Sequence, residues 1–364
     1  MKENTIYNFS AGPSMLPKKV LKKIHLEFGS WKRYGRSIIE ISHRSKNFLL
    51  ILESLEHNLR NLLKVPRNYR VLFFHGGARG QFSAVPMNLL GNNKHADYIS
   101  SGYWSYKAAE ESKKYCTPYI INVKKKLNKK TYISPMSNWN INFKSAYLHY
   151  CPNETIEGIA IHEEPSFNDN IVVVGDFSST LFSRIIDIKR YGVIYASAQK
   201  NIGPSGVTIV IIRQDLLGKF KVMCPSILNY TIMSENKSMF NTPTTFSLYV
   251  SDLVLKWIKK IGGLKKMEAL NKKKATLLYK AIDSTNFYIN NVSNYNRSYM
   301  NVVFNIKNIN LQSLFLKESY NFGLHFLKGH SIIGGFRASI YNSMPIEGVI
   351  KLVKFMKIFE KQYS

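Results

Sequence analysis

The chain has 364 residues, with 51 Lys or Arg against 23 Asp or Glu, which gives a formal net charge of +28. Its 45% hydrophobic and 13% aromatic residues exclude a mostly disordered chain, and its 21 Gly and 12 Pro are too few for a collagen-like or mucin-like one. The length predicts about two domains. There is no apolar run near the roughly 18 residues of a membrane span, no signal-peptide pattern and no disulfide framework, so we expect a cytoplasmic protein without a membrane partner.

Hydrophobic spacing predicts the elements of the first half of the chain. Residues 1–15 look irregular, and leucines at helical spacing predict a helix over 47–64. The apolar run 71–75 ends at a glycine pair, which is typical of a strand entering a turn. A strand with its loop over 97–104 and a helix over 105–115 follow.

The second half alternates in the same way and then changes character. Apolar, β-branched runs predict strands over 171–176, 193–198, 207–213, 301–306 and 336–341. Long helices are expected on both sides of Gly262-Gly263 and after Pro345. We therefore predict an α/β fold with a large domain over 16–262, whose mostly parallel central sheet is flanked by helices, and a smaller α+β domain from 1–15 and 263–364.

The most informative residues are an acid and a lysine at the ends of two predicted strands. Asp176 ends the strand 171–176, and Lys200 follows the strand 193–198. Open α/β sheets bind ligands at the carboxyl ends of their strands, so these residues favour a Schiff-base lysine and a carboxylate facing a pyridine nitrogen. From spacing alone, an exposed loop lysine and a turn-capping aspartate fit equally well.

A family resemblance decides between these interpretations. Ordered blocks along nearly the whole chain carry it: NFSAGPSMLP (8–17), EISHRSKNF (40–48), FFHGGARGQFSAVPMNLLG (73–91), GYWSYKA (102–108), HYCPNETIEGI (149–159), GDFSS (175–179), ASAQKNIGPSG (196–206), SMFNTPTTF (238–246) and GHSIIGGFRASIYN (329–342). Together they resemble the phosphoserine aminotransferases, a family of pyridoxal-phosphate enzymes with the fold type I of aspartate aminotransferase. The resemblance implies that fold and pyridoxal 5′-phosphate as the cofactor.

The resemblance also assigns residues to the cofactor. Lys200 corresponds to the Schiff-base lysine and Asp176 to the partner of the ring nitrogen. The remaining cofactor positions implied are Ala78 and Arg79 in the phosphate-cup turn, Trp104 stacked on the ring, Thr155 bonded to the ring, Gln199 at the phosphate, and Asn241 with Thr242 from a partner subunit. A homodimer with shared active sites follows from the last pair.

The substrate positions implied are basic. His43 and Arg44 correspond to the pair that grips the far anionic end of the substrate, Arg79 lies in the same site, and Arg337 corresponds to the arginine for the α-carboxylate. His330 corresponds to a further phosphate-end contact across the dimer. The chain departs from the family at Ser331, where bacterial relatives commonly carry arginine, so one positive charge near the substrate phosphate is missing.

The activity implied is transfer of the amino group of L-glutamate to 3-phosphohydroxypyruvate in serine biosynthesis. Family members also act on a phosphorylated hydroxy-oxo-butanoate in vitamin B6 synthesis, and the sequence does not decide whether this chain does. A drifted donor or acceptor preference is one alternative, for which Ser331 is the motive. A nucleic-acid-binding protein with a vestigial enzyme fold is the other.

The distribution of charge and cysteine argues against the second alternative. Lysines are densest at 124–126, 129–130 and 272–274, which we interpret as surface loops or the polar sides of helices. No basic aromatic helix or zinc-finger spacing is present, so we expect no nucleic acid and no metal. The cysteines lack a nucleophile loop and are interpreted as packing residues: Cys116, Cys151 and Cys224.

Overall fold

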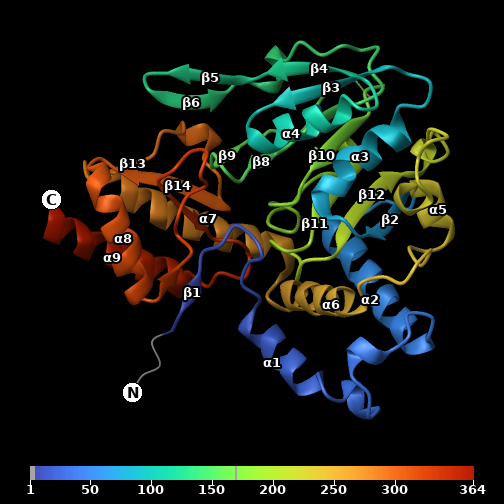
Figure 1. The fold of residues 1–364 in the computed structure, drawn as a ribbon, viewed down its shortest axis with the longest axis horizontal. Helices are drawn as coiled ribbons and strands as arrows, with labels where there is room; N and C mark the ends of the chain where they lie inside the picture. Colours follow the sequence, from blue (N-terminus) through green and yellow to red (C-terminus); the bar gives the residue numbers. More distant parts are fainter. Residues whose placement is uncertain (1–4, 169) are drawn as a thin grey trace.

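A seven-stranded sheet forms the centre of the computed structural model, which describes residues 5–168 and 170–364 (Figure 1). Its order is β2-β12-β11-β10-β7-β3-β4, and every neighbouring pair is parallel except the two that involve β12. The strands are β2 (Tyr69–Phe74), β3 (His95–Ser100), β4 (Thr117–Asn122), β7 (Leu148–Tyr150), β10 (Val173–Asp176), β11 (Val193–Ser197) and β12 (Thr208–Arg213). The predicted mostly parallel sheet is confirmed.

Helices cover both faces of this sheet and give it two cores. Side chains alternate along β2, so that Phe73 packs in one core while Leu72 and Phe74 pack in the other. The first core lies under α2 (Lys46–Leu63) and α6 (Thr245–Lys260). The second lies under α3 (Gly77–Leu89), α4 (Tyr103–Ser112) and α5 (Tyr230–Glu235).

A smaller antiparallel sheet, β13-β14-β16, has a core of its own beside the large sheet (Figure 1). Its elements are α7 (Gly263–Asp283), β13 (Tyr288–Ile289), β14 (Asn301–Ile306), α8 (Gln312–Asn321), β16 (Phe336–Ser339) and α9 (Ile346–Tyr363). The N-terminal segment joins this core, because β1 (Tyr7–Asn8) pairs with β15 (Leu324–His325) and Phe9 is buried there.

Local sequence accounts for the ends of the long helices. Ser45 accepts a hydrogen bond from the N–H of Phe48, which caps the start of α2. Gly262 adopts φ 111° between α6 and α7, a conformation that side chains disfavour, so the helical pattern breaks there. No helix of the described residues is both long enough and apolar enough to cross a bilayer.

Three features of the structure were not predicted from the sequence. The lysine run 124–126 lies in a strand, because β5 (Lys124–Leu127) and β6 (Lys130–Ile133) pair as an antiparallel hairpin. The irregular start contains the two-residue β1, and a helix that the spacing did not predict, α1 (Lys18–Glu27), follows it. A second short hairpin joins β8 (Asn153–Glu154) to β9 (Ile159–Ala160) and leads into the site below.

Candidate active site

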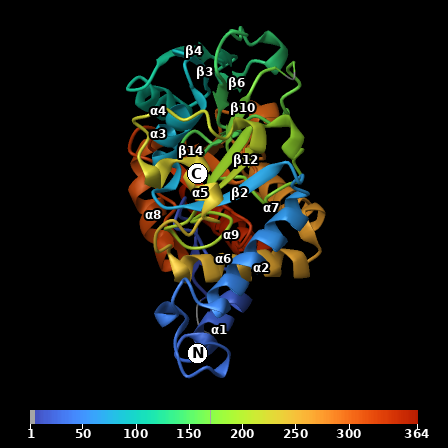
Figure 2. The same cartoon turned by 90° about the vertical axis from the view of Figure 1, so that its right-hand side faces the viewer.

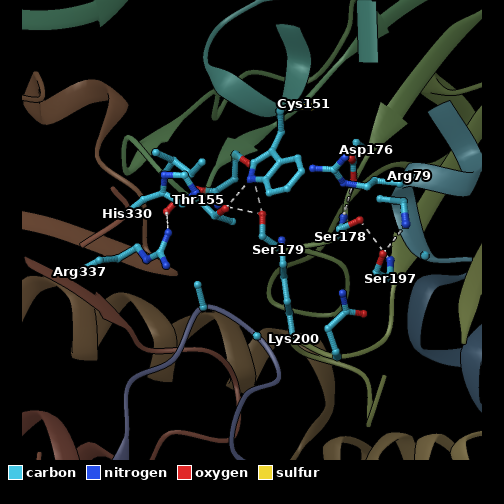
Figure 3. A pocket seen from close by; sticks show the side chains of 18 of the residues that line it. Arg79, Cys151, Thr155, Asp176, Ser178, Ser179, Ser197, Lys200, His330 and Arg337 are labelled. Carbon is cyan, nitrogen blue, oxygen red and sulfur yellow. Dashed lines mark hydrogen bonds between the residues drawn. The ribbon is translucent and has the colours of Figure 1, made fainter. Parts of the chain in front are cut away.

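A cavity of about 390 Å³ opens where β10 and β11 end, between the large sheet and β16 (Figure 3). Figure 3 shows Lys200 reaching into it, with His330 and Arg337 on one side and Arg79 and Ser197 on the other. The lining residues are Ala11, Gly12, Gly76, Gly77, Ala78, Arg79, Trp104, Cys151, Asn153, Thr155, Ile156, Asp176, Ser178, Ser179, Ser197, Gln199, Lys200, His330 and Arg337.

Lys200 and Asp176 face the cavity from neighbouring strands. Ser14 fixes the backbone of the turn that carries Lys200. The Ser14 hydroxyl donates to the Lys200 carbonyl, and the Ser14 backbone N–H donates to the Gln199 carbonyl at 2.9 Å. The Lys200 amine itself makes no hydrogen bond within the described residues. Burial lowers the pKa of Lys200, an effect that the charge of Asp176 opposes, so the neutral nucleophilic amine becomes more accessible.

Asp176 is buried at the end of β10. Its Oδ1 accepts the N–H of Ser178 at 2.9 Å. Burial raises the pKa of Asp176, while the Ser178 hydrogen bond and the Lys200 charge favour the carboxylate. A buried carboxylate of this kind gains most from a cationic partner, which a protonated pyridine nitrogen would supply.

The turn before α3 forms a cradle for an anion. Gly76 and Gly77 have φ of 86° and 63°, which brings the first turn of α3 to the cavity wall. The N–H of Ala78 donates to Ser197 Oγ at 2.7 Å, and α3 has no acidic residue in its first turn. The positive end of the helix dipole and these small residues fit a phosphate group.

Trp104 forms a third wall and is held at both its ring and its backbone. Its indole N–H donates to Thr155 Oγ1 at 2.9 Å, and its backbone N–H donates to Glu154 Oε2 at 2.9 Å. The guanidinium of Arg79 lies 5.5 Å from the indole ring centre. A flat aromatic cofactor ring fits against such a fixed indole face.

Arg337 on β16 supplies a cation from the smaller sheet. Its Nη1 donates to the Thr155 carbonyl at 3.2 Å, and burial lowers the pKa of the guanidinium without bringing it near neutrality. His330 lines the same cavity, with its ring centre 5.8 Å from that of Tyr103. The site therefore combines an amine, an acid, an anion cradle, an aromatic wall and an arginine.

Comparison with known proteins agrees with this geometry. The sequence pattern of "Aminotransferase class-V" matches residues 6–352, which is nearly the whole chain. The chain belongs to the class-V aminotransferase family. It is a pyridoxal-phosphate-dependent aminotransferase, because this family uses that cofactor and the cavity residues fit it.

Individual relatives agree along their full lengths. A phosphoserine aminotransferase of Buchnera aphidicola subsp. Baizongia pistaciae is 59% identical, covering 99% of this chain and 98% of its own. The solved phosphoserine aminotransferase of Bacillus circulans subsp. alkalophilus is 38% identical with a TM-score of 0.95 over 100% of both chains. The pyridoxal-phosphate-bound phosphoserine aminotransferase of Trichomonas vaginalis is 39% identical with a TM-score of 0.91, covering 97% of this chain and 99% of its own. The predicted fold type is confirmed.

The structure brings together nine of the residues that the sequence assigned to the aminotransferase site: Ala78, Arg79, Trp104, Thr155, Asp176, Gln199, Lys200, His330 and Arg337. His330 was expected from across a dimer but lines the cavity of its own chain, because the 328–336 bridge folds its loop onto the site. Four others lie outside this cavity. His43 and the exposed Arg44 sit in the turn before α2, and Asn241 and Thr242 are exposed in the loop before α6.

Several cavity residues escaped sequence reasoning. Ser197 donates its backbone N–H to Ser178 Oγ at 3.1 Å, so a hydrogen-bonded chain runs from Asp176 through the two serines to Ala78. Both serines lie in the blocks GDFSS and ASAQK, and their position at strand ends was the available signal. Cys151 also lines the cavity, where burial raises the pKa of its thiol well above the ordinary value, so it does not act as a nucleophile.

Proposed function

We propose that this aminotransferase transfers the amino group of L-glutamate to 3-phosphohydroxypyruvate, giving O-phospho-L-serine and 2-oxoglutarate. The observation that carries the proposal is the pairing of Lys200 and Asp176 with the basic side chains of Arg79, His330 and Arg337 in one cavity. Both partners of the reaction carry two anionic ends, which separate cations suit. The identity of 59% to a phosphoserine aminotransferase supports the same substrates.

Bound pyridoxal phosphate supplies an electron sink for the charge that develops on the substrate Cα. Lys200 would hold the cofactor through its Nζ, and the same amine, when free, would move the proton of the substrate Cα. Asp176 would keep the ring nitrogen protonated, since its carboxylate favours the adjacent positive charge. Trp104 would orient the ring from one face.

The remaining residues would bind the anions. Arg337, fixed by the Thr155 carbonyl, presents a guanidinium fork to the substrate α-carboxylate. The α3 N-terminus with Ala78 and Gln199 would hold the cofactor phosphate. Arg79 and His330, at the rim of the cavity, would face the distal phosphate or carboxylate of the substrate.

We further propose a homodimer in which a second copy supplies His43, Arg44, Asn241 and Thr242. These residues lie outside the cavity of their own chain. Exposed apolar side chains lie in the segments that precede these residues in the chain, as a face that packs on a second subunit requires. These side chains are Leu26, Phe28, Tyr34, Ile39 and Phe240, with exposed fractions of 67%, 48%, 58%, 51% and 43%.

The predicted domain division also remains a proposal: a large domain over 16–262, and a small domain over 1–15 and 263–364. The separate core beneath the smaller sheet, which includes Tyr7 and Phe9, supports it. The three cysteines are free, which supports a reducing compartment such as the cytoplasm.

The absorbance spectrum before and after adding L-phosphoserine tests the function. We expect a yellow protein whose colour fades with L-phosphoserine and returns with 3-phosphohydroxypyruvate. L-serine and L-alanine at equal concentration serve as controls and should leave the colour unchanged. A yellow protein that responds to L-alanine but not to L-phosphoserine would assign another substrate. Repeating the test with 4-phosphohydroxy-L-threonine decides the vitamin B6 activity.

A further inference from the structure

Glu154 is a fully buried acid that the proposed chemistry does not use. It lies on β8, immediately before Thr155, with an exposed fraction of 0%. Its Oε2 accepts the backbone N–H of Trp104 and its Oε1 accepts that of Ser105, both at 2.9 Å. The hydroxyl of Ser101 donates to Oε1 at 3.4 Å. The carboxylate therefore caps α4 from a neighbouring strand.

A second acid completes this cap. Glu157 accepts the N–H of Tyr103 at 2.9 Å, so three successive N–H groups of the first turn of α4 are bonded to two carboxylates. The first turn of α4 has no acidic residue of its own. Negative charge at this end complements the helix dipole and satisfies donors that an α-helix leaves free.

The arrangement leaves little freedom to the indole of Trp104. Glu154 holds its backbone, while the adjacent Thr155 accepts its ring N–H. The carbonyl of Thr155 also accepts from Arg337. Glu154 and Thr155 thus fix Trp104, and Thr155 also contacts Arg337 of the smaller sheet.

Burial disfavours the ionised form of the Glu154 side chain that caps α4. Burial and the neighbouring Glu157 both raise the pKa of Glu154, and the hydrogen bonds from Ser105 and Trp104 oppose this. Glutamine would not reproduce this cap, because each of the two backbone N–H groups bonds to a separate oxygen, and an amide replaces one of these oxygens with an NH₂ group that only donates. The backbone at Gly102 is shaped around it: a Cβ there would lie 2.5 Å from Glu154 Cγ.

We propose that Glu154 is a positioning residue, which holds the Trp104 indole in place against the cofactor ring by capping α4. This rests on the proposed role of Trp104. It does not depend on which amino acceptor the enzyme uses, so its test measures binding of pyridoxal phosphate to the apo-protein.

The first experiment combines Glu154→Gln with Trp104→Ala. Glu154→Gln alone should weaken pyridoxal phosphate binding roughly tenfold or more, because a charge-assisted hydrogen bond is lost. In the Trp104→Ala background the same change should add less than about threefold, since its effect passes through the indole. The matched control is Glu157→Gln, which leaves the Trp104 and Ser105 bonds intact and should cost less than about threefold.

The double variant distinguishes positioning from general stability. If Glu154→Gln weakens binding equally with and without the indole, or lowers only the unfolding midpoint, the proposal is wrong. A wild-type protein that fails to bind pyridoxal phosphate would instead overturn the proposed function.

Two further measurements apply if Glu154→Gln does not fold. Gly102→Ala should push the carboxylate aside and weaken cofactor binding in the same direction. Amide hydrogen exchange on the wild-type apo-protein needs no variant: the Trp104 and Ser105 amides should be protected before any cofactor is added. Protection that arises only with pyridoxal phosphate would overturn the proposal.

Discussion

The predicted site residues fall into two groups that differ in burial. One group forms what we call the inner wall of the cavity, and the other lies in outer loops of the chain. Asp176, Trp104 and Lys200 lie in buried or half-buried positions, with the Asp176 carboxylate and the backbones of Trp104 and Lys200 hydrogen-bonded. Arg44 and Asn241 lie exposed outside the cavity, and α1 with the loop after it projects from the body of the molecule (Figure 2). The residues proposed for the chemistry thus lie together in one chain, whereas some of the residues expected to bind the substrate anion lie outside the cavity.

Hydrogen bonds between distant segments hold the inner wall together within one chain. Asn201, next to Lys200, donates to the Ser179 carbonyl at 2.8 Å and accepts the N–H of Asn342 at 3.0 Å. Asn342 in turn accepts from Asn271 of α7 at 2.8 Å. These buried side-chain amides hydrogen-bond to one another and to the backbone. They therefore fix the turn of Lys200 relative to Asn342, which follows the Arg337-bearing strand β16.

Of the substitutions considered, Lys200→Ala should reduce activity the most. We expect kcat to fall by about 10²- to 10⁴-fold, because the group that moves the Cα proton is lost. Stopped-flow measurement of the half-reaction with L-phosphoserine checks this. Lys189→Ala, an exposed lysine after β10, is the control and should keep full activity. A Lys200→Ala enzyme within tenfold of the wild type would remove Lys200 from the chemistry.

Mixed dimers should show whether Arg44 acts in the active site of its own chain or in that of the second subunit. Arg44→Ala alone should raise KM for 3-phosphohydroxypyruvate roughly 10- to 100-fold, through loss of a charge-assisted hydrogen bond. Co-expressing Arg44→Ala with Lys200→Ala chains should restore activity, because a heterodimer then has one intact site of two.

The separate homodimers are the control for this mixing, and both should remain impaired. A mixture no more active than their sum would place Arg44 in the site of its own chain and contradict the shared active site.

The sequence predicted the inner wall well because its residues follow strong local patterns. Asp176 ends an apolar strand, Lys200 closely follows another, and the block around Trp104 is one of those that carry the family resemblance. The contact of Ala78 with Ser197 joins residues far apart in the chain, which no local pattern reports. The helix α1 was missed although Val20, Leu21 and Ile24 lie at helical spacing, because it is only ten residues long and four of these are lysines that flank or separate the few apolar residues.

Lowering the pH should reduce the folding stability through a buried histidine of the large sheet, His149. His149 is buried beside Tyr98 and Tyr195, with Nε2 2.8 Å from the Tyr195 hydroxyl, and burial lowers its pKa to about 3. The unfolded chain binds a proton there near pH 6.5, so the folded state binds fewer. The stability that His149 contributes is therefore present above about pH 6.5 and is lost as the pH falls, by up to about 1.4 kcal/mol per unit.

Urea unfolding at pH 7.5 and 5.5 checks this prediction. The wild type should lose more stability between these values than His149→Gln, by roughly 1 kcal/mol. His57→Gln, in which an exposed histidine of α2 is replaced, should keep the wild-type difference. Equal losses in wild type and His149→Gln would show that His149 does not control this pH dependence.

Ser331→Arg should have the smallest effect, because Ser331 is exposed beside His330 and water screens a charge there. An exposed ion pair contributes about 0.2–1 kcal/mol, so KM for 3-phosphohydroxypyruvate should fall by no more than about fivefold and the gain should shrink with salt. Ile332→Arg adds the same charge one residue away and should gain less. An unchanged KM in Ser331→Arg would show that the missing arginine is irrelevant, and equal gains in both variants would assign the effect to long-range attraction instead of a phosphate contact.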